Sequence, residues 1–282
     1  MIRDITIGQY YQTESVIHRL DPRVKLFGTL LFIISIFTYD NPLGYLMAVI
    51  FLLSVIQLSG VPIKFIVKGL KGIIIILMLT VLLNLFLTPG NEVIRIWRIS
   101  ITWEGIVTAL TMVIRLTMLI MGSSIMTLTT TPNNLTDGLE KGLGFLKVFK
   151  VPVADIAMMM SIALRFIPIL LEETDRIMKA QLARGADFES GNLIKRARAL
   201  VPVLVPLFVS AFRRAGDLAM AMEARCYRGG DTRTKMKPLI YKKRDVIAYI
   251  IIIGFMGLSI WLGRWKYMND LFESIYVSFL LK

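Results

Sequence analysis

Two arginines with very small neighbours are the residues of this sequence whose chemistry is most specific. They lie in two short motifs, Ala183-Arg184-Gly185 and Ala224-Arg225-Cys226. A guanidinium is permanently charged, and its planar fork can donate two parallel hydrogen bonds to a carboxylate. Small neighbours leave such a group free to enter a groove on a partner. The alternative is an ordinary helix C-terminus, where arginine is favoured by the helix dipole and glycine often follows.

The common motifs of catalysis, nucleotide binding and metal binding are absent from the sequence. It contains no GxxxxGK[ST] phosphate loop, no HExxH and no GxSxG, so we expect no ATP bound through such a loop and no enzyme of those classes. His18 is the single histidine and Cys226 the single cysteine, which excludes a multi-histidine metal site and an internal disulfide. We expect His18 to make a structural hydrogen bond. No catalytic residue, cofactor or metal is therefore predicted.

Two long segments must position the arginine motifs. In residues 152–183, charged residues interrupt the apolar ones every few positions, so no run of about 20 apolar residues is expected between residues 129 and 244. This pattern is typical of amphipathic helices that lie at a membrane surface or pack on each other. The basic run at residues 195–198 is interpreted as a solvated or lipid-facing edge. One set of apolar residues is expected to join the two helices: Met158, Met159, Met160, Leu164 and Ile167 against Leu204, Phe208, Val209 and Phe212.

The remainder of the chain has the composition of a membrane protein. Of its 282 residues, 55% are hydrophobic, above the 45–50% that is usual for soluble domains. We predict about five spans, with three at 66–87, 105–128 and 246–263. Residues 24–58, with a turn at Asp40-Asn41-Pro42, fit two short spans or a tilted hairpin equally well. Arg115 would lie near the middle of a span, and we interpret it as structural. Gly138 and Gly142 form a GxxxG that predicts close helix packing.

The distribution of charge predicts the orientation. The net charge is +13, and residues 129–244 carry 20 Lys and Arg against 11 Asp and Glu, whereas the 89–104 loop has two of each sign. Basic loops stay on the cytoplasmic side, so the N-terminus and residues 129–244 are expected in the cytoplasm. The basic excess indicates contact with anionic lipid, not nucleic acid, because the residue patterns of a nucleic-acid-binding protein are not apparent.

Four stretches of the sequence carry a resemblance to a known family. They are SVIHRLDPRVKL (15–26), LTTTPNNLTDGLEKGL (128–143), LRFIPILLEETDRIMKAQLARGADF (164–188) and VPLFVSAFRRAGDLAMAMEARCYRGG (205–230). Together they resemble the transmembrane T component of energy-coupling factor (ECF) transporters, the family also called EcfT or CbiQ. Both arginine motifs match in order and setting, with Cys226 where glycine is common.

The resemblance implies an all-α membrane protein of the prokaryotic cytoplasmic membrane. It would have about five transmembrane helices and a cytoplasmic coupling region of three helices, two of them long and ending in the arginine motifs. The implied division is 1–128 for four spans, 129–244 for the coupling region and 245–282 for the last span and tail. The implied partners are two ABC-type ATPase subunits, which bind the ATP and receive the two arginines, and a membrane S component that captures a vitamin or metal ion.

Two other functions stay open at the level of sequence. A stand-alone secondary transporter would need a polar site near the membrane midplane. An intramembrane enzyme would need clustered acidic or histidine residues near the membrane face.

Overall fold

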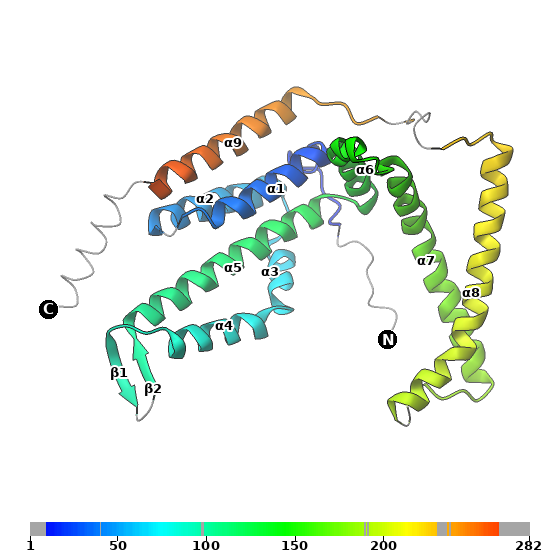
Figure 1. The fold of residues 1–282 in the computed structure, drawn as a ribbon, viewed down its shortest axis with the longest axis horizontal. Coiled ribbons are helices and arrows are strands. Elements are labelled where there is room, and N and C mark those ends of the chain that lie inside the picture. The colour runs from blue at the N-terminus through cyan, green and yellow to red at the C-terminus, as the bar shows by residue number, and fades with distance from the viewer. Residues whose placement is uncertain are drawn as a thin grey trace. The chain divides into compact units, whose positions relative to one another are not determined.

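The computed structural model describes residues 10–39, 41–96, 99–188, 190, 192–229, 236 and 238–264, which form an almost entirely helical chain (Figure 1). The elements in chain order are α1 (Pro22–Ile36), α2 (Pro42–Ser59), α3 (Ile63–Lys71), α4 (Ile74–Leu87), β1 (Glu92–Ile96), β2 (Ile99–Thr102), α5 (Trp103–Thr129), α6 (Pro132–Gly142), the 3-10 helix η2 (Leu143–Phe149), α7 (Val153–Ala183), α8 (Leu193–Ala224) and α9 (Lys243–Arg264).

The helix starts follow from local sequence chemistry. Asp21 caps α1 by accepting a hydrogen bond from the backbone N–H of Arg23, and proline occupies the first position of α1 and of α2. Proline is favoured there because its fixed φ suits a helix and its missing N–H would have no helical partner. Asn41 precedes α2, so the predicted break at this point is confirmed.

Five described helices are long and apolar enough to cross a membrane: α2, α5, α7, α8 and α9. The expectation that residues 129–244 contain no stretch able to span a membrane is therefore wrong for α7 and α8. Both helices are apolar enough overall to qualify, although their sequences include charged residues. The span predicted over residues 66–87 is not one straight helix, although α3 and α4 together are long and apolar enough for a span. The chain breaks between α3 and α4, which are bent by 63° relative to each other. If this pair forms one span, the number of candidates rises to six.

The loop between α4 and α5 contains a short antiparallel hairpin that was not predicted. Strand β1 pairs with β2 in the register Ile96–Ile99, Arg95–Ser100 and Ile94–Ile101, with an irregularity toward Glu92. Thr102 then caps α5, because its side chain accepts a hydrogen bond from the backbone N–H of Gly105.

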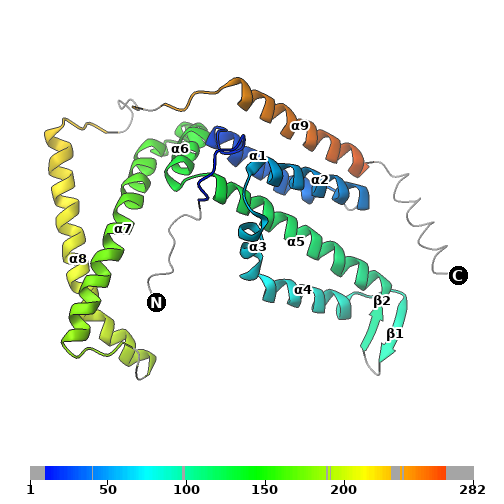
Figure 2. The same cartoon turned by 180° about the vertical axis from the view of Figure 1, so that it is seen from behind.

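The chain divides into two compact units, with boundaries after Gly138 and after Pro238. The first, which we call the bundle unit, holds α1 to α5, most of α6, and α9. In it α5 contacts α1, α2, α3 and α4, and α9 contacts α1 and α2 (Figures 1 and 2). Its buried core includes Phe32, Ile36, Tyr45, Leu52 and Met118. The second, the hairpin unit, holds η2, α7 and α8.

Candidate functional site

The first arginine motif forms the C-terminal cap of α7. Ala183 is the last helical residue, Arg184 is the cap residue and Gly185 has a φ of +87°. The backbone N–H of Gly185 donates to the carbonyl of Leu182, and the N–H of Ala186 donates to that of Gln181, each at 2.9 Å. These two bonds define a Schellman motif, which satisfies the last carbonyls of a helix and turns the chain away.

The second motif forms the same cap on α8. Arg225 is the cap residue, and Cys226 follows with a φ of +57°. The N–H of Cys226 donates to the carbonyl of Glu223 at 2.8 Å, and that of Tyr227 donates to Met222 at 3.1 Å. The two motifs therefore share one backbone geometry, although their surrounding sequences differ.

The cap geometry gives a second reason for the small residue after each arginine. A Cβ added at Gly185 would meet no atom within 4 Å, so space alone does not require glycine there. The positive φ of Gly185 is what favours glycine, because a side chain crowds the backbone in this conformation. The same conformation at Cys226 makes it one of two non-glycine residues with positive φ in the described chain, the other being Lys150.

Both arginine side chains are available for a partner. All six residues of the two motifs are exposed. Among the described residues, no hydrogen bond or ion pair uses the guanidinium of Arg184 or Arg225. Each charge lies at a helix C-terminus, where it compensates the negative end of the helix dipole.

The two helices run antiparallel, which carries the arginines to opposite ends of the hairpin unit. Three contacts fix the register: the Tyr227 hydroxyl donates to Asp155 at 3.4 Å, Arg214 to Glu173 at 2.9 Å, and the Gln181 side chain to the Pro202 carbonyl at 3.4 Å. Arg225 is thus level with the first turns of α7, and Arg184 lies beyond its last turn. At 1.5 Å per residue, the two are separated by about 40 Å along the helix axis.

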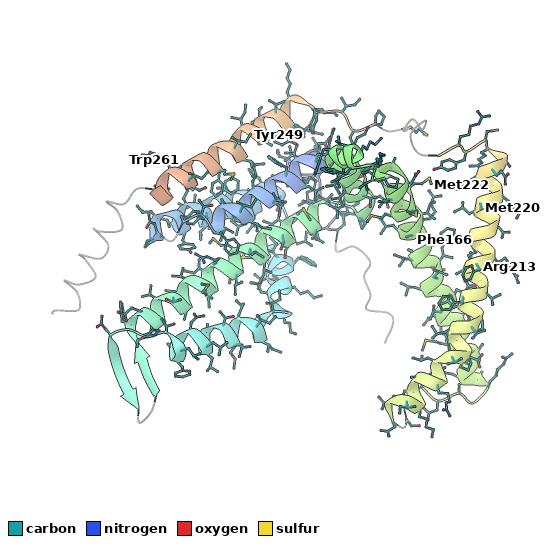
Figure 3. The ribbon with its side chains drawn as sticks, in the orientation of Figure 1. Phe166, Arg213, Met220, Met222, Tyr249 and Trp261 are labelled. Carbon is teal, nitrogen blue, oxygen red and sulfur yellow. The ribbon has the colours of Figure 1, made fainter. Side chains whose placement is uncertain are left out.

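The contact between α7 and α8 uses a different face from the predicted one. Met159, Phe208 and Phe212 are 58%, 62% and 73% exposed, so the predicted packing of these residues is wrong. The helices instead enclose a cavity of about 280 Å³ between them, lined by Ile162, Phe166, Leu170, Ala211, Arg214, Ala215, Leu218, Ala219 and Met222. Figure 3 shows Phe166 and Met222 between the helices, with Arg213 and Met220 on the outer side of α8.

The missed signal was a row of alanines every fourth residue on α8. Ala211, Ala215 and Ala219 line the cavity and let the two helices approach, as small residues do at helix interfaces. Both faces of each helix are rich in large apolar residues, so side-chain size alone could not indicate the contact.

The basic run on α8 belongs to the Arg184 end of the hairpin unit. Lys195, Arg196 and Arg198 are exposed, and the antiparallel register brings the start of α8 level with the last turns of α7. Asp187 is exposed at the same end, so this end of the unit carries charges of both signs with basic residues in excess. The sequence interpretation of a solvated edge agrees with their exposure but missed their place beside the first motif.

The other residues singled out in the sequence have structural contacts in the bundle unit. Arg115 donates a hydrogen bond to the Tyr45 hydroxyl and lies 5.5 Å from the ring centre of Phe37. His18 bonds to Ser15 at 2.7 Å and to the Tyr11 carbonyl at 3.0 Å. Burial lowers the pKa of His18 below its ordinary value, which favours a neutral ring in this network.

The GxxxG prediction holds for one of its two glycines. A Cβ at Gly138 would lie 3.0 Å from the side chain of Pro22, so Gly138 packs closely on α1 and an added methyl group would crowd it. A Cβ at Gly142 would meet nothing within 4 Å, and the prediction is wrong at that position.

The fold and this site together define a multi-helix membrane protein that presents two arginine-capped helix ends on a separate hairpin unit. The sequence pattern of the family described as "Cobalt transport protein", CbiQ, matches residues 13–236. The energy-coupling factor transporter transmembrane protein EcfT of Thermosediminibacter oceani is 54% identical over 249 residues, covering 88% of this chain and 94% of that protein. The EcfT proteins of Clostridium kluyveri and Bacillus subtilis are 52% and 45% identical and cover 94% and 93% of this chain and 100% and 99% of their own. The chain belongs to the EcfT family of ECF transporter transmembrane components.

Proposed function

We propose that this chain is the non-catalytic scaffold of an ECF-type importer, in which two ABC-type ATPases dock on the two arginine motifs. The observation that carries the proposal is the pair of matching helix caps, each presenting an exposed arginine without a partner among the described residues. A guanidinium held in this way can meet a carboxylate in a groove bidentately and can be desolvated there without steric conflict.

The separation of the motifs supports two docking partners in place of one. Two sites about 40 Å apart, as the antiparallel register gives, are too distant for a single groove. A pair of ATPases with one groove each fits this spacing. The excess of basic residues at the Arg184 end, with Lys195, Arg196 and Arg198 against Asp187, favours an acidic groove there, because charge complementarity speeds association and fixes orientation.

The contacts within the hairpin unit suggest how movement would be transmitted. The ion pair between Arg214 and Glu173 and the bond between Tyr227 and Asp155 tie α7 to α8 at two levels. ATP-driven closure of the ATPase pair would move both arginines, and the tied helices would pass that displacement to a substrate-binding membrane S component. The S component would release its vitamin or transition-metal ion. ATP would be bound by the partner chains, consistent with the missing phosphate loop in this sequence.

This mechanism requires the hairpin unit and the N-terminus to lie in the cytoplasm of a prokaryotic cell. The loop charges support that orientation, because residues 129–244 hold 20 basic residues and the 89–104 loop holds two.

Co-purification from native membranes in mild detergent tests the proposal. The tagged chain should retain two ATPase chains that contain a GxxxxGK[ST] loop, together with a small membrane protein, all identified by mass spectrometry of the intact complex. A chain that purifies alone, yet moves a solute in proteoliposomes without ATP, would contradict the scaffold function and support the secondary transporter.

A further inference from the structure

An apolar cavity of about 420 Å³ lies within the bundle unit, between α1, α2, α5 and α9. It is separate from the arginine motifs, and the proposed docking of ATPases does not use it. Its lining is mostly aliphatic and aromatic, and its polar members are Lys25, Thr29, Ser54, Thr129 and Arg244.

The hydroxyl groups in the wall are already satisfied. Thr29 donates to the carbonyl of Lys25, Ser54 to that of Ile50, and Thr129 to that of Ile125, each at 2.8 Å and each within its own helix. A water needs two to four polar partners in a cavity, and this wall offers few. The cavity is therefore suited to a hydrocarbon chain.

The side chains of Lys25 and Arg244 are the two cationic groups that line this cavity, and both belong to the same end of it. Lys25 is in the first turn of α1, and Arg244 is in the first turn of α9. The Lys25 ammonium donates to the carbonyls of His18 and Thr129, at 3.2 and 2.8 Å, which leaves one N–H of the three. The Nε of Arg244 is buried without a hydrogen-bond partner, and its charge repels that of Lys25.

The nearby carboxylates of Asp21 and Asp245 attract Lys25, but their hydrogen bonds are made to other groups. Asp21 accepts a bidentate pair of hydrogen bonds from Arg23, each at 3.0 Å. Asp245 is only 1% exposed and accepts from the backbone N–H groups of Asp21 and Lys242, at 2.9 and 2.8 Å. An anion from outside the chain could accept from the remaining N–H of Lys25 and from Arg244.

We propose that this cavity binds an anionic glycerophospholipid, with one acyl chain in the apolar space and the phosphate between Lys25 and Arg244. Both cations lie in the first turns of their helices, which is the level at which lipid headgroups meet a membrane protein. From Arg244 to Ile252 the lining of α9 extends for about 12 Å at 1.5 Å per residue, enough for the upper part of an acyl chain. The lipid would fasten α9, the last described helix, to α1 and α2.

Thermal unfolding of the delipidated full-length chain in detergent tests this binding. Titration with dioleoylphosphatidylglycerol should raise the Tm in a saturable way, and dioleoylphosphatidylcholine should act far more weakly. Arg244→Gln should weaken the apparent affinity for phosphatidylglycerol about fivefold, as expected for one cation near an anionic headgroup, while Arg244→Lys retains most of it. Lys243→Gln is the matched control, since Lys243 is exposed and does not line the cavity.

The acyl-chain half of the proposal has its own variant. Ser54→Trp should fill the cavity from the exposed side of α2 and abolish the phosphatidylglycerol effect, with Ser54→Ala as the control. Equal Tm shifts from both lipids would indicate only general solvation by lipid, and equal shifts from inorganic phosphate would indicate an anion site without a chain. Either result overturns the proposal, as does unchanged phosphatidylglycerol binding in Arg244→Gln or in Ser54→Trp. Loss of a membrane partner from Ser54→Trp with lipid binding retained would instead assign the cavity to that partner.

Discussion

Replacing Cys226 with glycine should stabilise the cap that presents Arg225. Cys226 holds a φ of +57° at the position after the cap residue, and this backbone conformation costs a non-glycine residue about 1–2 kcal/mol. Glycine removes that cost but loses about 0.4–1 kcal/mol through the greater freedom of the unfolded chain. The net expectation is a cap more stable by about 1 kcal/mol.

Hydrogen exchange at the capping amides measures this change directly. The N–H of Tyr227 donates to the Met222 carbonyl only while the cap is closed, so its exchange reports local opening. A gain of about 1 kcal/mol should slow its exchange about fivefold, since 1.4 kcal/mol corresponds to tenfold. The effect should be confined to peptides that cover the end of α8.

Two glycine variants serve as controls with opposite expected signs. Gly185→Ala places a side chain at a φ of +87° and should speed exchange at the Ala186 amide by a similar factor. Gly216→Ala lies inside α8 with nothing within 4 Å of the new methyl group, and it should stabilise the helix by about 0.5–1 kcal/mol. Faster or unchanged exchange in Cys226→Gly would refute the assignment of the second motif as a strained Schellman cap.

Three further outcomes are expected. In a chain without its native cysteine, a cysteine at Asn91 should react with an impermeant maleimide from outside the cell, and one at Asn192 only after permeabilisation; the reverse pattern would overturn the orientation. Asp245→Asn should lower the thermal stability of the bundle unit by about 1.5–3 kcal/mol, because the buried carboxylate accepts two backbone N–H groups, and an unchanged Tm would argue against this link between α1 and α9. Cysteines at Phe166 and Leu218, which line one cavity, should cross-link with a short reagent, whereas a pair on the exposed faces of α7 and α8 should not.

Sequence reasoning worked best where a residue type has one local structural role, such as beginning or ending a helix. Proline after Asn41 marked the break before α2, and the small residues after Arg184 and Arg225 marked two helix ends. These features are local, so no knowledge of packing was needed. The functional interpretation of the motifs as docking groups is not local, and it stays a prediction.

Most of the wrong or missing predictions concern contacts between helices, where the local sequence pattern fits more than one packing arrangement. The break between α3 and α4 follows Lys68, Lys71 and Gly72, a helix-end signal that the prediction of a span over residues 66–87 did not use. On α7 and α8, large apolar residues occupy both faces, and the partner face is selected by alanines that allow close approach. The Asp21–Asp245 contact joins residues 224 positions apart, and neither residue has a sequence signature that indicates its partner.

The docking proposal predicts a specific cost for removing each arginine. Truncating one member of a buried charge pair costs about 2–5 kcal/mol, mostly because the other charge is left unpaired. A loss of 2.8 kcal/mol is about a hundredfold in affinity, so one substitution should weaken ATPase docking and two should abolish it. Lysine should rescue poorly, because it keeps the charge but loses the planar fork.

The most direct measurement is retention of the ATPases by Arg184→Ala, Arg225→Ala and the double variant, at matched expression and membrane insertion. Arg213→Ala is the control, since Arg213 is exposed on the outer side of α8 and away from both caps (Figure 3). We predict partial loss in each single variant, complete loss in the double variant and none in the control. If the double variant retains both ATPases as well as the unmodified chain does, the two arginines are ordinary helix caps and the docking function is wrong.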